Sequence, residues 1–113
     1  MINIVLYHNS EKQLCGYCIS GHAGFAQKGE DIVCSAVSVL SINTINAIEQ
    51  LTDTTFLCDA DEQKGGYLKV MLSDMKKGIY CHDAEILLKA MAIGLKDLSK
   101  QYKKYIRLQY EEV

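Results

Sequence analysis

Residues 31–51 read D-I-V-C-S-A-V-S-V-L-S-I-N-T-I-N-A-I-E-Q-L, a long apolar run that begins directly after an acidic residue. Asp31 is a favourable helix N-cap, because its carboxylate can accept hydrogen bonds from the free N–H groups of a first helical turn. Apolar residues then recur at helical spacing from Ile32 to Leu51. The stretch therefore predicts a long helix over 32–51.

Strand-like segments lie on both sides of this helix, and a second helix follows them. The first two strands form a hairpin around a polar turn at 9–12, since the flanking residues suit a pleated surface. The element order ββαββαβ predicts one α+β domain over 1–113, in which a mixed or antiparallel sheet packs against two helices. The predicted strands cover 2–8, 14–20, about 55–58, 67–72 and 105–110, and the second helix covers about 83–102 with Ile86, Leu87, Ala90, Met91, Leu95 and Leu98 on one stripe.

The composition is that of a globular protein, with 113 residues, 49% hydrophobic and 23% charged. A net charge of −2 gives no strong attraction to polyanions, so neither nucleic acid nor an anionic membrane is an expected partner. No stretch is expected to supply the roughly 20 apolar residues of a membrane span. Five cysteines without a secretory signal predict free thiols in a reducing, cytoplasmic setting.

Cys34 is the strongest candidate for chemistry, because it lies in the first turn of the predicted helix. Unpaired N–H groups at a helix start favour a thiolate, which is the attacking species in cysteine catalysis. The same N–H groups, including that of Cys34, are candidate donors to the oxyanion of a tetrahedral intermediate. Ser38 lies on the same helix face as Cys34, and its small side chain leaves space beside the sulfur.

His22 is the candidate general base, on a loop twelve residues before Cys34. Gly21, Gly24 and Gly29 are expected hinges of that loop, which has to return to the helix start. An imidazole brought to the thiol in this way can take its proton and later protonate the leaving amine.

Asp31 has two possible roles that the sequence leaves open. Its carboxylate can cap the helix, or it can orient the second imidazole nitrogen as the third group of a triad does.

A rival pattern is the C-x-x-C motif Cys15-Gly16-Tyr17-Cys18, which is a candidate zinc or redox centre. It falls in a predicted strand, where residues three apart point to opposite faces. No second C-x-x-C completes a ligand set, so we expect no metal site. Cys58 is interpreted as an ordinary core or turn thiol.

Two blocks in the chain carry a resemblance to a known family. G-H-A-G-F at 21–25, followed by G-E-D-I-V-C-S-A-V-S at 29–38, resembles the signature of the ribosomal-processing cysteine proteases. The strand around 66–70 and the second helix are also similar to that family, so the resemblance covers most of the chain.

The resemblance implies an endopeptidase with His22 and Cys34 as its catalytic pair. The implied substrate is the N-terminal extension of the large-subunit ribosomal protein numbered twenty-seven, and a partly apolar cleft is expected beside Cys34. It also implies a homodimer, no cofactor, and a glycine loop that orders over the substrate. Ser35 stands where alanine is more usual, and Cys15 and Cys18 are not part of the family pattern, so that pair should be dispensable.

Two other functions stay open on the sequence. The first is a non-catalytic, ribosome-associated module that binds peptides in the same cleft. The second is a metal or redox protein centred on Cys15 and Cys18.

Overall fold

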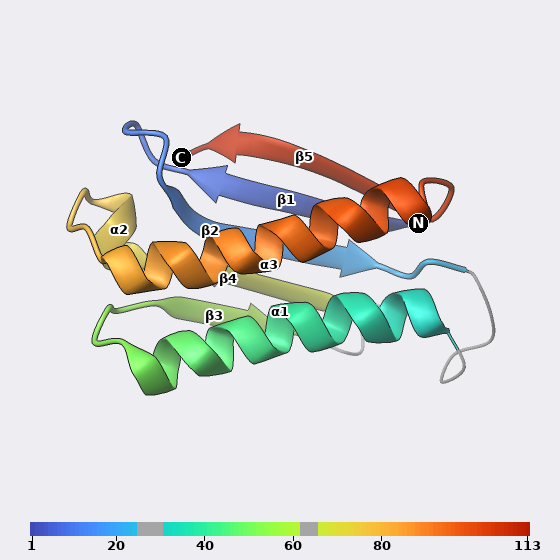
Figure 1. Cartoon of the computed structure of the whole chain (residues 1–113), viewed down its shortest axis with the longest axis horizontal. Helices are drawn as coiled ribbons and strands as arrows, with labels where there is room; N and C mark the ends of the chain where they lie inside the picture. The colour runs from blue at the N-terminus through green and yellow to red at the C-terminus, as the bar shows by residue number, and fades with distance from the viewer. Residues whose placement is uncertain (25–30, 62–65) are drawn as a thin grey trace.

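A computed structural model describes residues 1–24, 31–61 and 66–113 of the chain. The predicted hairpin, long helix, second strand pair, second long helix and final strand all appear in that order (Figure 1). The elements are β1 (Ile2–His8), β2 (Leu14–Gly21), α1 (Ile32–Leu51), β3 (Leu57–Ala60), β4 (Tyr67–Met71), α2 (Ser73–Lys76), α3 (His82–Gln101) and β5 (Ile106–Glu112).

The five strands form one mixed sheet in the order β3-β4-β2-β1-β5. Neighbouring strands run antiparallel except for β5, which pairs parallel to β1 with Ile2 opposite Ile106. The hairpin register places Leu6 opposite Tyr17, and an irregularity follows Tyr7. The predicted α+β fold class is therefore confirmed, with β3 and β5 as the two edges.

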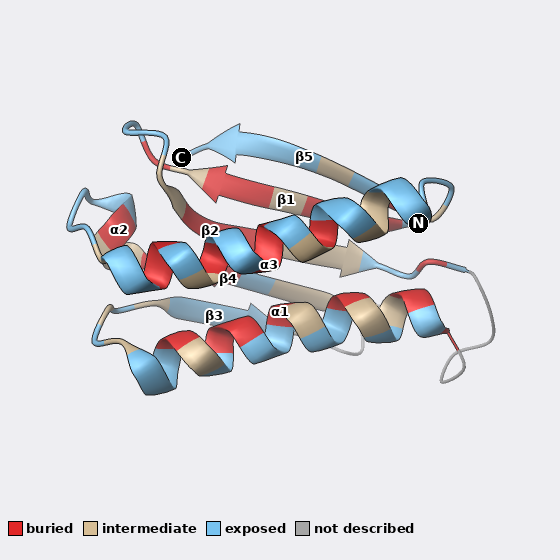
Figure 2. Ribbon diagram, viewed as in Figure 1, coloured by how far each residue is buried: buried red, intermediate tan, exposed pale blue. Residues whose placement is uncertain are grey.

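Helices α1 and α3 lie side by side over one face of the sheet, as Figure 1 shows. Side chains that alternate along the strands fill the layer between, because successive residues of a strand point to opposite faces. Ile4, Leu6 and Tyr17 are fully buried there (Figure 2). The helices approach closely at Gly94, where an added Cβ would lie 2.9 Å from Leu40 Cδ1. A side chain at position 94 would therefore push α1 and α3 apart.

Helix α1 covers the predicted range of 32–51. It carries no charged residue between Ile32 and Ile48, and by length and composition it would be long enough to cross a membrane. The expectation that no stretch approaches such a composition is therefore wrong. Val33, Val37 and Ile48 of this helix are buried in the described structure, since they pack into the core. The same apolar composition thus serves as the inner face of a core helix.

The buried stripe of α3 differs from the predicted one. Ile86 and Ala90 are exposed, whereas Ala84 and Ala92 are buried. The predicted stripe also omitted Leu88, so it was rotated about the helix axis relative to the buried face. The buried apolar residues are Ala84, Leu88, Met91, Ala92 and Leu95, which recur at spacings of three and four.

The turn of helix α2 was not predicted from the sequence. It occupies the segment after β4, where the buried Met75 fills the end of the core. Tertiary burial of one side chain holds this short helix, which has too few residues to form on its own. Strand β3 begins at Leu57, two residues later than predicted, and β5 begins at Ile106.

Tyr17 ties the sheet to α1. Its side chain is fully buried, and its hydroxyl donates a 2.7 Å hydrogen bond to the carbonyl oxygen of Ser41. Burial raises the pKa of this hydroxyl well above its ordinary value, so it stays a donor. The bond fixes the middle of α1 over β2.

We expect Tyr17→Phe to lower the free energy of unfolding by about 1 kcal/mol, because it removes one buried hydrogen bond without changing the packing. Urea denaturation measures this. Tyr110→Phe is the matched control, since Tyr110 is exposed on β5, and it should leave the unfolding midpoint unchanged. Equal midpoints for Tyr17→Phe and the wild type would show that the hydroxyl contributes nothing.

Candidate active site

Cys34 lies in the first turn of α1, and Asp31 fixes that turn. The Asp31 carboxylate is buried and accepts hydrogen bonds from Val33 N at 3.0 Å and Cys34 N at 3.1 Å. Both donors would otherwise be unpaired at the helix start. Of the two roles left open for Asp31, capping the helix is therefore the one observed.

This cap corrects one expectation about the oxyanion. The N–H group of Cys34 is already engaged with Asp31 Oδ1, so it is not a free donor to a substrate. The N–H of Ala23 instead donates a 3.3 Å hydrogen bond to Cys34 Sγ. The residue after His22 therefore contacts the sulfur directly.

The thiol is less acidic than its place at a helix start suggests. Burial raises the pKa of Cys34 first of all, and the charge and hydrogen bond of Asp31 raise it further. The N–H of Ala23 and the amino group of Met1 act in the opposite direction. The net direction is upward, so most of the thiol keeps its proton near neutral pH and a base is needed to form the thiolate.

His22 follows directly after β2 and lines the same pocket as Cys34. Its carbonyl oxygen accepts a hydrogen bond from the amino group of Met1. On its other side, a Cβ added at Gly66 would lie 3.7 Å from His22 Cε1. The contacts in the described part of the chain include none between the imidazole and the thiol, as is common before a substrate binds.

Of the three predicted hinge glycines, Gly21 and Gly24 lie among the described residues. Gly21 and Gly24 both have positive φ, at 88° and 71°, a region that glycine adopts at low cost. An added Cβ at Gly21 would lie 2.4 Å from the carbonyl oxygen of Met1, so only glycine fits there. Gly29 lies outside the described residues.

The pocket beside Cys34 has a volume of about 410 Å³ and a mostly apolar lining. Ser38 lines it, as the helix spacing predicted. The sequence did not identify the wall opposite α1, because that wall comes from strands distant along the chain. Ile19, Cys58, Ala60, Gly66, Tyr67 and Leu68 make up that wall.

Two residues of this wall, Cys58 and Gly66, could have been noticed in the sequence. Cys58 was interpreted as a core or turn thiol, but it is exposed on β3 and faces the pocket. Gly66 has a φ of 84°, and its carbonyl oxygen accepts a hydrogen bond from Gly21 N at 3.0 Å. The pair of glycines at 65 and 66 was the signal that could have marked this close approach.

The C-x-x-C motif lies within β2, but a register irregularity between Leu14 and Gly16 interrupts the strand alternation at Cys15, so the prediction of opposite faces stays a prediction. Cys15 is fully buried, and burial raises the pKa of its thiol to about 11. Cys18 pairs opposite Val5 and is only partly buried, and both cysteines are free thiols in the structure.

We expect Cys15→Ser to lower the free energy of unfolding by about 1–3 kcal/mol, because it puts a hydroxyl into an apolar site. Cys18→Ser is the matched control at a partly buried site in the same strand, and its effect should stay below about 0.5 kcal/mol. Urea denaturation compares the two. Equal losses would show that the two thiols do not differ in burial.

Asp31→Asn should lower the pKa of the Cys34 thiol. Asparagine still caps the helix, but the negative charge that opposes the thiolate is gone. The rate of alkylation at Cys34, followed by peptide mass spectrometry against pH, should therefore reach its midpoint at lower pH. Asp97→Asn, on the exposed surface of α3, should leave the midpoint unchanged. A midpoint that stays or rises in Asp31→Asn would contradict the assigned effect of the carboxylate.

Comparisons with known proteins show the family of the chain. The family model described as cysteine protease Prp matches residues 1–107. A ribosomal processing cysteine protease of Bacillus subtilis is 27% identical over 108 residues, covering 96% of each chain.

Two solved structures are also similar over nearly the whole chain. One is the crystal structure of an essential ribosomal processing protease from Staphylococcus aureus with a covalently linked product peptide, at a TM-score of 0.89 and 28% identity, covering 98% of this chain and all of that one. The other, from Streptococcus mutans, has a TM-score of 0.84 and 32% identity, covering all of this chain and 96% of that one. Because the family model spans residues 1–107 of the 113, the chain belongs to the cysteine protease Prp family.

Proposed function

We propose that this cysteine protease removes the N-terminal extension of the large-subunit ribosomal protein numbered twenty-seven, with Cys34 as nucleophile and His22 as base. The observation that carries the proposal is that both side chains line one apolar pocket. The name of the Bacillus subtilis relative supports a ribosomal substrate, and the product peptide linked covalently to the Staphylococcus aureus relative supports a covalent intermediate.

The reaction uses the groups of the pocket in two stages. His22 takes the proton from Cys34 Sγ, and the thiolate attacks the carbonyl carbon of the scissile bond. The tetrahedral intermediate then collapses, the C–N bond breaks, and His22 gives the proton to the leaving amine. A water molecule, deprotonated by His22, hydrolyses the thioester and releases the peptide and the thiol.

The raised pKa of the Cys34 thiol makes His22 the group on which the proposed reaction depends most. Because burial and Asp31 disfavour the thiolate, the free protein holds few charged sulfurs near neutral pH. The N–H of Ala23 offsets part of that effect and stays close to the sulfur. Removal of His22 should therefore cost most of the rate, while the apolar pocket still binds peptide.

Incubation with the extended ribosomal protein, followed by intact-mass spectrometry, tests the activity. The wild type should remove one N-terminal segment, and Cys34→Ala should remove none. We expect His22→Ala to lose roughly 10²- to 10⁴-fold in rate. His82→Ala is the matched control, since His82 is an exposed histidine at the start of α3, and it should cleave at the wild-type rate.

The results also separate this proposal from a peptide-binding module without activity. The raised pKa of Cys34 is the observation that favours such a module. Binding of the extension without any cleavage by the wild type would favour the module. Cleavage by Cys34→Ala would overturn the assignment of the nucleophile.

We also propose that the protein acts as a homodimer in the reducing cytoplasm. The five free cysteines support the compartment. Val39 and Ile42 are exposed on the uncharged surface of α1, which supports association through that helix. Light scattering at several protein concentrations measures the mass, and a monomer throughout would overturn the dimer.

A further inference from the structure

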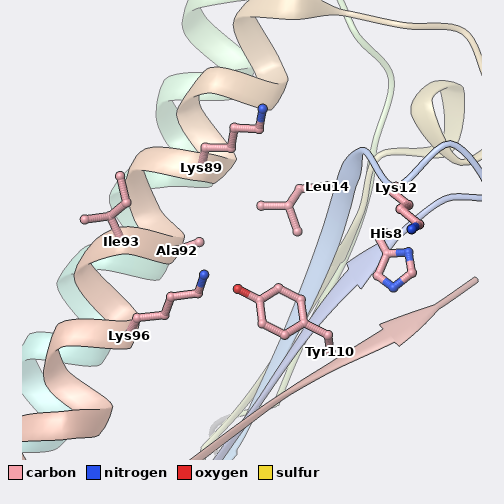
Figure 3. A pocket seen from close by; sticks show the side chains of 8 residues that line it. All are labelled: His8, Lys12, Leu14, Lys89, Ala92, Ile93, Lys96 and Tyr110. Carbon is pink, nitrogen blue, oxygen red and sulfur yellow. The ribbon is translucent and has the colours of Figure 1, made fainter.

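We propose that a second pocket, between α3 and the β1–β5 side of the sheet, binds acidic peptide segments that carry an apolar side chain. The pocket has a volume of about 480 Å³, within the range of ligand sites. Figure 3 shows Leu14 at its centre, with Ala92 and Ile93 on α3 to one side and Tyr110 projecting from β5 toward the helix. Its floor is therefore apolar.

This pocket is separate from the one at Cys34. The two share no lining residue. They lie at opposite ends of β2, since Leu14 begins that strand and Gly21 ends it. Seven residues of extended strand span roughly 20 Å. Binding here can consequently be measured without disturbing the catalytic groups.

The rim of the pocket is cationic. Lys12, Lys89, Lys96 and His8 line it, and none of the lining residues is acidic. Lys89 has Glu85 as a partner at 3.7 Å. Within residues 1–24, 31–61 and 66–113, Lys12 and Lys96 have no carboxylate partner.

Lys96 is held near the pocket by the ring of Tyr110. Its Nζ lies 5.1 Å from the ring centroid, a cation–π distance. Lys89 is seven residues before it on α3, so the two lysines lie about 10 Å apart along the same helix face. Ala92 lies between them, and its small side chain leaves the apolar gap open.

On the side of the pocket opposite α3, Lys12 lies in a turn where its backbone φ is positive. Its φ is 61°, and it is the non-glycine residue with positive φ in the described part of the chain. The buried Asn9 builds this turn, because its Oδ1 accepts hydrogen bonds from Glu11 N and Gln13 N. Asn9 Nδ2 also donates to the Met75 carbonyl, which ties the turn to the core. The position of Lys12 is therefore fixed by the fold.

The chemistry of the pocket favours a short acidic peptide. Lysines on both sides of an apolar floor suit two carboxylates that flank an apolar side chain, and residues three apart in an extended peptide span about 10 Å. A nucleic acid would need a wider basic surface than this rim offers, and the net charge of the chain is −2. The lining also contains no arginine, which is frequent in phosphate sites.

Amide chemical shifts of the whole chain, followed during titration with a peptide, test the proposal. The probe is a hexapeptide with blocked ends, Ser-Asp-Leu-Ala-Asp-Ser, and the matched peptide has asparagine in place of both aspartates. The aspartate peptide should shift the amides of Leu14, Ala92, Ile93 and Tyr110. The asparagine peptide should bind about tenfold more weakly, because two exposed ion pairs are lost.

A matched pair of variants tests the lysines. The double variant Lys12→Gln with Lys96→Gln should lose about tenfold in affinity for the aspartate peptide. Lys100→Gln with Lys104→Gln changes the net charge equally at exposed sites outside the pocket and should bind as the wild type does.

Three results would overturn the proposal. The first is an absence of shifts at the four lining amides, and the second is equal binding of the two peptides by the wild type. The third is tighter binding of a short oligouridylate at the same amides, which would favour nucleic acid. The comparison of the two peptides uses the wild type alone, so it holds even if the double variant fails to fold.

Discussion

The cap that Asp31 places on α1 is the interaction on which the site depends. One buried carboxylate begins the helix, fixes the turn that carries Cys34, and occupies the N–H of that cysteine. The same charge lies close enough to raise the pKa of the thiol. The carboxylate that positions Cys34 thus adds to the larger effect of burial in favouring the protonated thiol. Stability of the helix start and reactivity of the sulfur are opposed at this residue.

The rest of the fold brings His22 and Ala23 to the start of α1, where Cys34 lies. Strand β2 ends at Gly21, where contact with the Met1 carbonyl leaves no room for a side chain. His22 follows immediately, and the N–H of Ala23 reaches Cys34 Sγ. The sheet and α1 are joined further along by the bond from Tyr17 to Ser41. The end of one strand and the start of one helix are therefore held together by the core.

The β1–β2 hairpin separates two regions of different chemistry. The end at Gly21 contributes to an apolar pocket with a thiol and an imidazole, whereas the turn end contributes to an apolar pocket with a lysine rim. Each pocket lies between a helix and the sheet, α1 in the first case and α3 in the second. Both pockets form because two helices do not cover the whole face of a five-stranded sheet.

The sequence by itself determined the order of the strands and the two long helices and the bounds of α1. Periodicity, capping and spacing along the chain are local properties, so they can be read without the fold. Only the tertiary structure decided the wall formed by β3 and β4, the turn of α2 around Met75, and the buried alanines of α3. It also decided the direction in which the pKa of Cys34 moves, because burial and the Asp31 carboxylate outweigh the N–H of Ala23 and the amino group of Met1. These features depend on which distant segments pack together, and no local pattern encodes that packing.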